Sequence, residues 1–197
     1  LINEFVGRYA DFPDTRVMAN GARTCFNEAN GIVTHNIVSA PDDVLLGWLD
    51  TEYTLFKYME EKVYSNITTN PFPNIDTFVA MANEVLNRRK SRAGKSLEHH
   101  LADIFTRNEL IFEEQVIAEE KKKPDFVFPN GMCYHNLTFP GELLTILGAK
   151  TTCKDRWRQV LNEADRVDDK YLFTLQQGIS SNQLKEMQDY RLHLVVP

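Results

Sequence analysis

Three residues of the chain are of the types that cleave phosphodiester bonds: Asp125, Lys150 and Glu163. Asp125 stands between a proline and the apolar residues 126–128, and this pattern predicts a short strand with an acid at its head. Lys150 follows the apolar run 143–147, which predicts a second, buried strand. An acid and a lysine on neighbouring strands form the framework of a magnesium-dependent phosphodiesterase site. Alone, the aspartate is typical of a strand edge and the lysine of a solvated surface, so the combination carries the argument.

The second acid is expected on a helix that folds back along the lysine strand. Apolar residues recur at helical spacing from 157 to 164, which predicts a helix beginning near Asp155, a favourable N-cap residue. If the strand runs through Cys153, rises of ~3.3 Å per strand residue and ~1.5 Å per helix residue put Lys150 and Glu163 roughly level. An ammonium group would then lie beside a carboxylate.

A wider set of residues resembles the PD-(D/E)XK restriction endonucleases. The resemblance is carried by Pro124-Asp125, Gly148-Ala149-Lys150, Lys154-Asp155-Arg156-Trp157-Arg158-Gln159 and Glu163. The simple pattern of these enzymes has an acid two residues before the lysine, where this chain has Gly148. The subgroup that tolerates this change carries the second acid on the following helix, where Glu163 stands. Within that subgroup the sequence is similar to catalytic C-terminal domains of the EcoRII type, from about Asp50 to the end.

The resemblance implies an α/β restriction-endonuclease-like core, with a central mixed five-stranded β-sheet flanked by α-helices. The implied activity is that of a type II site-specific deoxyribonuclease in restriction-modification defence. It would be a Mg²⁺-dependent homodimer that cuts double-stranded DNA at CCWGG, where W is A or T. Its catalytic residues would be Asp125, Lys150, Glu163 and Glu98, with Asp125 and Glu163 as the metal ligands; carboxylate oxygens suit Mg²⁺.

Glu98 shares a helical face with apolar residues between 101 and 105, in a helix that Ser96 is expected to cap. An acid at the edge of an apolar stripe is costly unless a cation meets it. The resemblance makes Glu98 a support of the metal site. The alternative is a glutamate at the rim of the core, paired with Arg92 or Lys95.

Cations gather in two stretches, although the formal net charge of −6 argues mildly against a nucleic-acid partner. One stretch is residues 88–95, which is either a solvated helix face or, with Arg92, a phosphate contact. The other is the turn before the predicted helix, with Lys154, Asp155, Arg156 and Arg158. Lysine and arginine can read guanine, and aspartate accepts from cytosine, so the first three of these suit G·C base pairs. The fourth is expected to contact a backbone phosphate.

The chain has 197 residues and 43% hydrophobic content, which is enough for one substantial core. We expect a single endonuclease catalytic domain over residues 1–197, with an irregular N-terminal segment over residues 1–40. Because the chain begins with Leu1, we expect a fragment of a longer chain whose missing N-terminal region is a candidate regulator. No apolar run approaches the ~20 residues that cross a bilayer, so no membrane partner is expected. Three scattered cysteines predict reduced thiols in a cytoplasmic protein.

The remaining elements complete an α/β alternation. An acidic start and an amphipathic stripe predict a helix over residues 42–64, which packs on the core or contributes to a dimer contact. Strands are expected over residues 112–117, 171–175 and 192–196, and a helix over residues 182–190.

Other functions stay open beside the restriction endonuclease. Tyr134, next to His135, could serve as the nucleophile of a covalent strand-transfer enzyme, but the Arg/His set of such enzymes is not evident, and sheet packing is favoured. A structure-specific or repair nuclease on the same scaffold is a second alternative. A non-catalytic DNA-binding module is a third, and it is disfavoured because Asp125, Lys150 and Glu163 would then have no reason to coincide.

Overall fold

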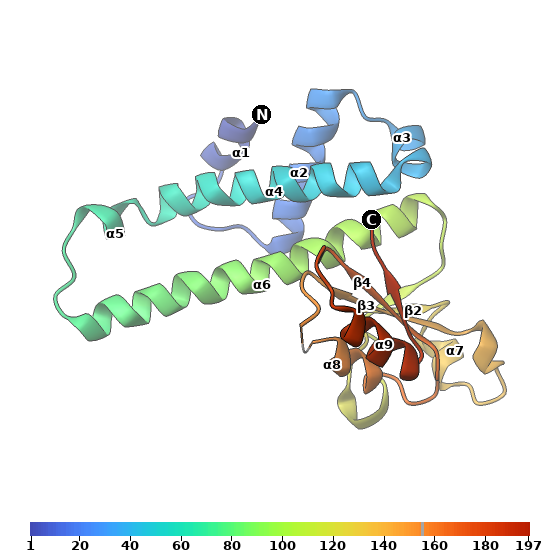
Figure 1. The fold of residues 1–197 in the computed structure, drawn as a ribbon. Helices are drawn as coiled ribbons and strands as arrows, with labels where there is room; N and C mark the ends of the chain where they lie inside the picture. Colours follow the sequence, from blue (N-terminus) through green and yellow to red (C-terminus); the bar gives the residue numbers. More distant parts are fainter. Residues whose placement is uncertain (155) are drawn as a thin grey trace. The chain divides into compact units, whose positions relative to one another are not determined.

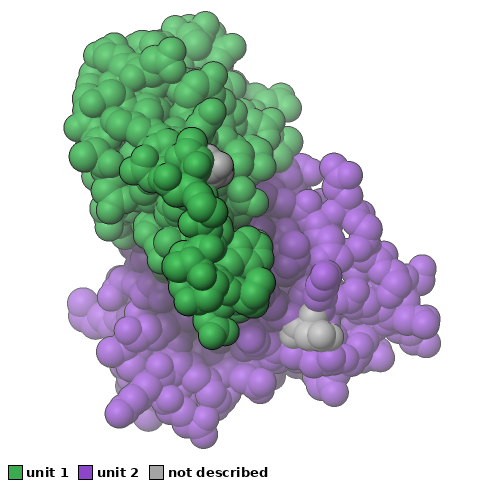
Figure 2. Space-filling model, turned by 90° about the vertical axis from the view of Figure 1, so that its left-hand side faces the viewer, with its two compact units in different colours: residues 1–104 green, residues 105–197 purple. Residues whose placement is uncertain are grey.

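A computed structural model describes residues 1–154 and 156–197, without the side chain of Thr68. This part of the chain forms two compact units, residues 1–104 and residues 105–197 (Figure 2), and each is described by itself. The expectation of a single catalytic domain over residues 1–197 stays a prediction. Every helix in the described part is too short or too polar to traverse a bilayer.

The first unit is built from helices (Figure 1). They are α1 (Ile2–Gly7), α2 (Thr15–Asn30), α3 (Thr34–Ser39), α4 (Pro41–Val63), α5 (Ser65–Thr69) and α6 (Ile75–Arg107), whose last three residues belong to the second unit. The predicted irregular segment over residues 1–40 is wrong, because α1, α2 and α3 lie there. Asp14 caps α2 by accepting a hydrogen bond from the Arg16 amide, and Gly31 ends it in the left-handed conformation.

A shared core holds these short helices against α4. Its buried members are Phe5, Val6, Met18, Ala22, Leu55, Phe56 and Met59. Isolated helices of this length are marginal in water, so burial against α4 supplies most of their stability. The predicted helix over residues 42–64 is confirmed as α4.

Helix α6 is longer than the sequence predicted. Ser96 was expected to begin a helix, but it lies inside one continuous helix of 33 residues. The arginines and lysines of residues 88–95 are good helix formers, and the helix continues through this stretch in spite of Gly94. Ser96 is buried, and its hydroxyl donates to Glu52 Oε2 at 2.8 Å.

Glu52 is the centre of a buried polar network between α4 and α6. Its Oε2 lies 2.9 Å from His100 Nε2, and its Oε1 lies 3.7 Å from Arg92 Nη1. On the other side of the imidazole, Arg23 Nη1 lies 3.1 Å from His100 Nδ1. A guanidinium can only donate, so Nδ1 accepts and the imidazole is neutral. Burial lowers the pKa of His100, and this outweighs the opposite effect of Glu52.

The second unit contains the mixed five-stranded sheet that the sequence predicted (Figure 1). Its elements are β1 (Glu113–Glu114), η1 (Glu119–Lys121), β2 (Phe126–Phe128), α7 (Gly131–His135), η2 (Gly141–Leu143), β3 (Thr145–Lys150), α8 (Trp157–Leu161), β4 (Lys170–Thr174), α9 (Ser181–Asp189) and β5 (Leu192–Val195). The strand order is β1-β2-β3-β4-β5. The first three strands pair antiparallel, and the last three pair parallel.

The two faces of the sheet carry different cores. On one face of β2, Phe126 and Phe128 contact the ring of Phe105 edge-on, with centroids 5.2 and 5.4 Å away. Val127 points the other way, into a cluster with Val116, Ala118, Tyr134, Leu144, Ile146, Ala164 and Val167. Helices α8 and α9 pack on the parallel strands through Trp157, Val160, Met187, Leu172 and Leu192.

Helix α8 packs against β3 at Gly148. A Cβ atom at position 148 would lie 2.6 Å from Cγ2 of Val160, closer than real side chains pack. The helix therefore rests directly on the strand because this residue has no side chain.

We predict that His100 makes the stability of the protein depend on pH. Its folded pKa is lowered from 6.5, so below about pH 6.5 the unfolded chain binds more protons and stability falls. His100→Gln keeps groups that can accept from Arg23 and donate to Glu52, but does not titrate. Between pH 7 and pH 5 the melting temperature of the original protein should fall more than that of the variant.

The comparison uses one ionic strength, because Arg23, Glu52 and Asp103 also face this site. The lowered pKa values of Glu60 and Glu119 act below pH 4.5 and are common to both proteins. Parallel pH curves would show that His100 binds protons equally in the folded and unfolded states, and this would contradict the prediction.

We also predict that Gly148→Ala destabilises the second unit by about 1–3 kcal/mol, the usual cost of overpacking a core. Val160→Ala in the same chain should recover part of the loss, because it removes the methyl groups that the new Cβ meets. Gly178→Ala is the control, since nothing lies within 4 Å of a Cβ there. Urea denaturation measures these proteins together with the single variant Val160→Ala, and strictly additive losses in the double variant would contradict the contact.

Candidate active site

Asp125 is held in one orientation by three donors. Its Oδ2 accepts from the Ala149 amide and from Lys150 Nζ, both at 2.7 Å, and Gln115 Nε2 donates to Oδ1 at 3.3 Å. The register of the sheet explains this, because Phe126 pairs with Leu147 in the antiparallel ladder. The residue before Phe126 therefore faces the end of β3. The predicted adjacency of the acid and the lysine is confirmed.

Glu163 reaches the same lysine from the other side. Its Oε1 lies 3.9 Å from Lys150 Nζ, so the two residues are level, as the rise per residue predicted. The predicted helix is too long. Helix α8 ends at Leu161, so Glu163 lies in the turn after the helix and not within it. The helix also begins later than expected, with Arg156 at its N-cap; Asp155, the predicted cap, lies outside the described residues.

The donor set at this place fits a hard divalent cation. The side chains of Asp125, Lys150 and Glu163 are 7%, 15% and 15% exposed, so the charges interact in a partly desolvated environment. In the residues that the structure describes, no group of three or more His, Cys, Asp or Glu side chains is arranged to hold a metal. Mg²⁺ commonly uses one or two carboxylates and keeps several waters, so two convergent carboxylates match its chemistry.

Glu98 belongs to the first unit, on α6. Its carboxylate accepts from Lys95 Nζ at 2.6 Å, and its side chain is 13% exposed. This contact agrees with the alternative of a glutamate paired at the rim of the core. The part of Glu98 in the metal site stays a prediction.

The basic turn after β3 is held by amide side chains that the sequence did not single out. Gln176 Oε1 accepts from the Cys153 amide at 2.7 Å, and Gln183 Nε2 donates to the Lys154 carbonyl at 2.8 Å. The side chains of Lys154 and Arg156 are exposed. A lone glutamine has no distinctive spacing, so neither these residues nor Gln115 gave a signal in the sequence.

Arg158 is exposed on α8 and bonds to Glu186 Oε1 at 2.7 Å. The pair is half-exposed, so water and salt screen it and it is weak. A stronger anion could replace the carboxylate. Its predicted phosphate contact, like the base contacts of Lys154, Asp155 and Arg156, stays a prediction.

The basic residues 88–95 of the first unit are largely engaged by acids. The pairs are Arg88 with Glu84, Arg89 with Glu60, Arg92 with Glu52 and Lys95 with Glu98. The side chain of Arg92 is 13% exposed and lies over the rings of Phe56 and Tyr53. This burial favours a structural role for Arg92 over the predicted phosphate contact, and the stretch as a whole is closer to the alternative of a solvated helix face.

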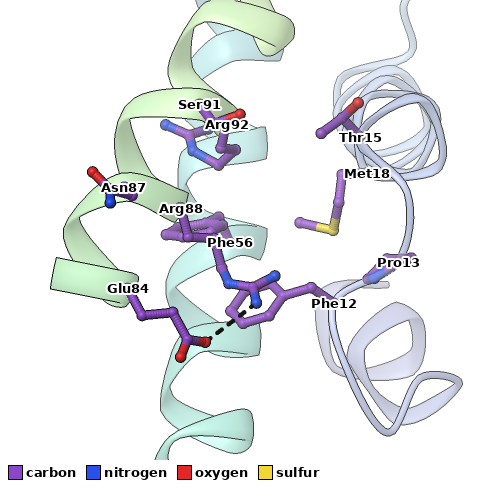
Figure 3. Close-up of a pocket in the computed structure, with 10 residues that line it drawn as sticks. All are labelled: Phe12, Pro13, Thr15, Met18, Phe56, Glu84, Asn87, Arg88, Ser91 and Arg92. Atoms are coloured by element: carbon purple, nitrogen blue, oxygen red, sulfur yellow. Dashed lines mark ion pairs between the residues drawn. The ribbon is translucent and has the colours of Figure 1, made fainter. Parts of the chain in front are cut away.

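A pocket of about 410 Å³ lies beside these arginines in the first unit (Figure 3). Its walls are Phe12, Pro13, Thr15, Met18, Phe56, Glu84, Asn87, Arg88, Ser91 and Arg92. The guanidinium of Arg88 covers the ring of Phe12 at 4.5 Å and pairs with Glu84 at 3.6 Å. The two arginines that line the pocket, Arg88 and Arg92, thus pair with glutamates of the same unit, so their charges are compensated and do not attract an anion.

Tyr134 is buried and packs against the sheet, as the favoured interpretation predicted. Its hydroxyl donates to the Glu119 carboxylate at 2.6 and 2.8 Å. Burial and this bond raise the pKa of Tyr134, so the hydroxyl is a poor nucleophile. This geometry argues against the covalent strand-transfer alternative.

Known proteins share sequence and fold with this chain. The family described as "EcoRII C terminal" matches residues 56–197. Over 158 residues the chain is 51% identical to the type II restriction enzyme EcoRII of Escherichia coli, covering 80% of this chain and 39% of that enzyme. The chain therefore spans well under half the length of this relative.

Solved structures show the same fold at low sequence identity. Metal-depleted Ecl18kI, in complex with uncleaved, modified DNA, superposes with a TM-score of 0.76 at 17% identity, covering 100% of this chain and 75% of that chain. The restriction endonuclease PspGI, in complex with substrate DNA, gives 0.75 at 17% identity over 94% of this chain and 77% of that chain. The chain has the PD-(D/E)XK restriction-endonuclease fold and belongs to the EcoRII C-terminal family.

Proposed function

We propose that this chain is the catalytic part of a type II restriction endonuclease, which hydrolyses phosphodiester bonds in double-stranded DNA at a specific sequence. The observation that carries the proposal is the convergence of Asp125, Glu163 and Lys150 at the end of β3. Family membership supports it, because a relative at 51% identity is a type II restriction enzyme.

In this proposal the chain holds a divalent cation, Mg²⁺ by preference, through Asp125 and Glu163. When bound, the cation lowers the pKa of a coordinated water and neutralises phosphate charge. Lys150 Nζ lies 2.7 Å from one carboxylate and 3.9 Å from the other, so its ammonium can orient the attacking water and stabilise the negative charge of the transition state. The Ala149 amide and Gln115 keep the Asp125 carboxylate in place, and Glu98 is proposed to support the site.

The proposed target is CCWGG. Lys154, Asp155 and Arg156 follow the catalytic strand directly and have the side chains that read guanine and cytosine edges in the major groove. Similarity to EcoRII supports the complete site, including the central pair. Arg158, on the next helix, is proposed to hold a backbone phosphate.

We propose a homodimer, because each strand of a near-palindromic site needs its own catalytic centre. Helix α4, which exposes Leu46, Tyr53 and Tyr58, is proposed to contribute to the dimer contact. The relative is longer than this chain, which supports a further region that regulates cleavage. The three cysteines are free thiols, as expected for a protein of restriction-modification defence in the reducing cytoplasm.

Asp125→Ala, Lys150→Ala and Glu163→Ala should each reduce DNA cleavage by about 10²–10³-fold or more, because the two acids hold the cation and the lysine stabilises negative charge in the transition state. The assay uses mixed-sequence plasmid with Mg²⁺ and follows discrete fragments on a gel. Chelation of the metal should abolish cleavage, and Mn²⁺ should substitute for Mg²⁺.

Glu142→Ala is the matched control, since Glu142 is an exposed acid of the same unit. Retained cleavage by Glu163→Ala would remove Glu163 from the site. Fragments of every length would instead favour a nuclease without sequence specificity, selective cutting of branched substrates would favour a repair nuclease, and binding without cleavage would favour a DNA-binding module.

Arg156→Ala and Arg158→Ala should fail in different ways. Loss of a base contact should cost Arg156→Ala about 1–3 kcal/mol of discrimination between CCWGG and a singly substituted duplex. Loss of a phosphate contact should weaken Arg158→Ala equally on both duplexes and flatten the salt dependence by roughly one unit of slope. Equilibrium binding in Ca²⁺, at several salt concentrations, measures both.

Glu186→Ala is the matched control for Arg158, because it removes the carboxylate that holds the same guanidinium. It should bind both duplexes at least as tightly as the original protein. Equal losses on cognate and substituted duplexes for both Arg156→Ala and Lys154→Ala would place sequence recognition elsewhere in the chain.

A further inference from the structure

We propose that Arg166 is a positioning residue that fixes Glu163 at the metal site, with Glu119 and Tyr134 as a second anchor. The inference rests on the proposed function, because it concerns the metal site of that activity. It explains how an acid outside any helix or strand is held where a metal ligand must be.

Glu163 lies after the end of α8 and needs another support to keep its side chain in place. Because α8 ends at Leu161, Glu163 is not held by a helical hydrogen-bond ladder; its amide donates to Val160 O in a single turn. The next turn, from Ala164 O to the Val167 amide, is similarly local. Turns of this kind do not fix a side chain by themselves, so the position of Glu163 depends on what holds the residues that follow.

Arg166 holds this segment to the end of α7. Its Nη1 donates to the carbonyls of Cys133 and Tyr134, and its Nη2 donates to the Phe139 carbonyl at 2.5 Å. The last carbonyls of a helix lack partners within the helix, and a planar guanidinium can serve several of them at once. One side chain therefore joins the Glu163 turn to three backbone positions.

Glu119 provides the second anchor. Its Oε2 accepts from the Asp165 amide at 3.2 Å, and both oxygens accept from the Tyr134 hydroxyl. Burial alone would raise the pKa of Glu119, but these bonds outweigh it and lower the pKa, so the carboxylate is ionised and accepts strongly. Tyr134 thus connects both anchors, since its carbonyl accepts from Arg166.

Apolar burial completes the arrangement. Ala164 and Val167 lie on either side of the anchored residues, and both are buried in the cluster with Val127, Tyr134 and Ile146. The buried and anchored side chains thus hold the segment on the core, while Glu163 extends to Lys150. A displacement of about 1 Å at a catalytic group can cost roughly 100-fold in rate, so such anchoring has functional weight.

The test measures metal binding as well as cleavage. Arg166→Ala should raise the Mg²⁺ concentration for half-maximal cleavage by about tenfold, the usual effect of a residue that orients a metal ligand. It should raise the Ca²⁺ concentration for half-saturation of the DNA complex by the same factor, measured by calorimetry without cleavage. Arg166→Lys should recover part of the loss, because an ammonium can still donate to these carbonyls.

A double-mutant cycle separates positioning from general stability. In a Glu163→Ala background, Arg166→Ala should leave the Ca²⁺ midpoint unchanged, whereas a merely structural role would shift it in both backgrounds. Arg191→Ala is the matched control, since Arg191 bonds to the exposed Asp168 in the same unit. If Arg166→Ala does not fold, Arg166→Lys and Tyr134→Phe replace it in the cycle, each with a smaller expected shift.

The outcomes distinguish this inference from the proposed function. Equal metal midpoints for the original protein and the Arg166 variants, with normal cleavage by the original protein, would overturn the inference alone. Metal binding without cleavage in the original protein would overturn the proposed function, and the Ca²⁺ midpoints would still decide on Arg166. An original protein that neither binds metal nor cuts DNA would overturn both.

Discussion

The direct packing of α8 on β3 is the constraint on which the candidate site depends. The methyl groups of Val160 fill the space that a side chain at position 148 would need. An acid at this position would therefore push the helix away from the strand. The same close approach brings the end of α8 towards Lys150, so that Glu163 can reach the lysine from the turn beyond the helix. The close packing at Gly148 thus excludes an acid from the strand position of the simple PD-(D/E)XK pattern, and it allows Glu163 to approach Lys150 instead.

Most strands were predictable from local signals, whereas the mixed five-stranded sheet was implied by the family resemblance, and β1 is only two residues long where a strand over residues 112–117 was expected. The apolar runs around β2 and β3, and the acid and lysine at their ends, define the strands and the site without long-range information. The helices of residues 1–40 were missed for two reasons: α1 and α3 are too short to show a helical repeat, and the local signals of α2, the cap Asp14 and the terminating Gly31, were not recognised. Glu163 was correctly expected beside Lys150, but it was expected within a helix and lies in the turn after α8. Local spacing indicates that a helix follows the strand, but where the helix ends depends on its packing.

Charge was the least informative feature of the sequence. Residues 88–95 are a basic stretch of the sequence, but in the folded protein most of these cations form ion pairs with glutamates of α4 or of α6 itself. The glutamates of α4 are distant in sequence, so counting cations cannot reveal that they are already neutralised. The residues that hold the site were equally hidden, because Gln115 bonds to the side chain of Asp125, and Gln176 and Arg166 bond to backbone atoms of remote segments. Such contacts are a property of the fold and leave no pattern in the chain.

The basic turn and Lys150 of the candidate site share one continuous piece of main chain, since Lys154 follows Lys150 by four residues. Gln176 and Gln183 tie the backbone of this turn to the segment after β4 and to α9. An insertion or deletion in the turn would therefore strain the strand that carries the lysine. On the proposed function, relatives with new DNA targets can evolve through exchanges of side chains at a constant turn length. On this proposal, relatives that recognise other DNA sequences should keep the same number of residues between the lysine at position 150 and the base-contacting residues at positions 154 and 156.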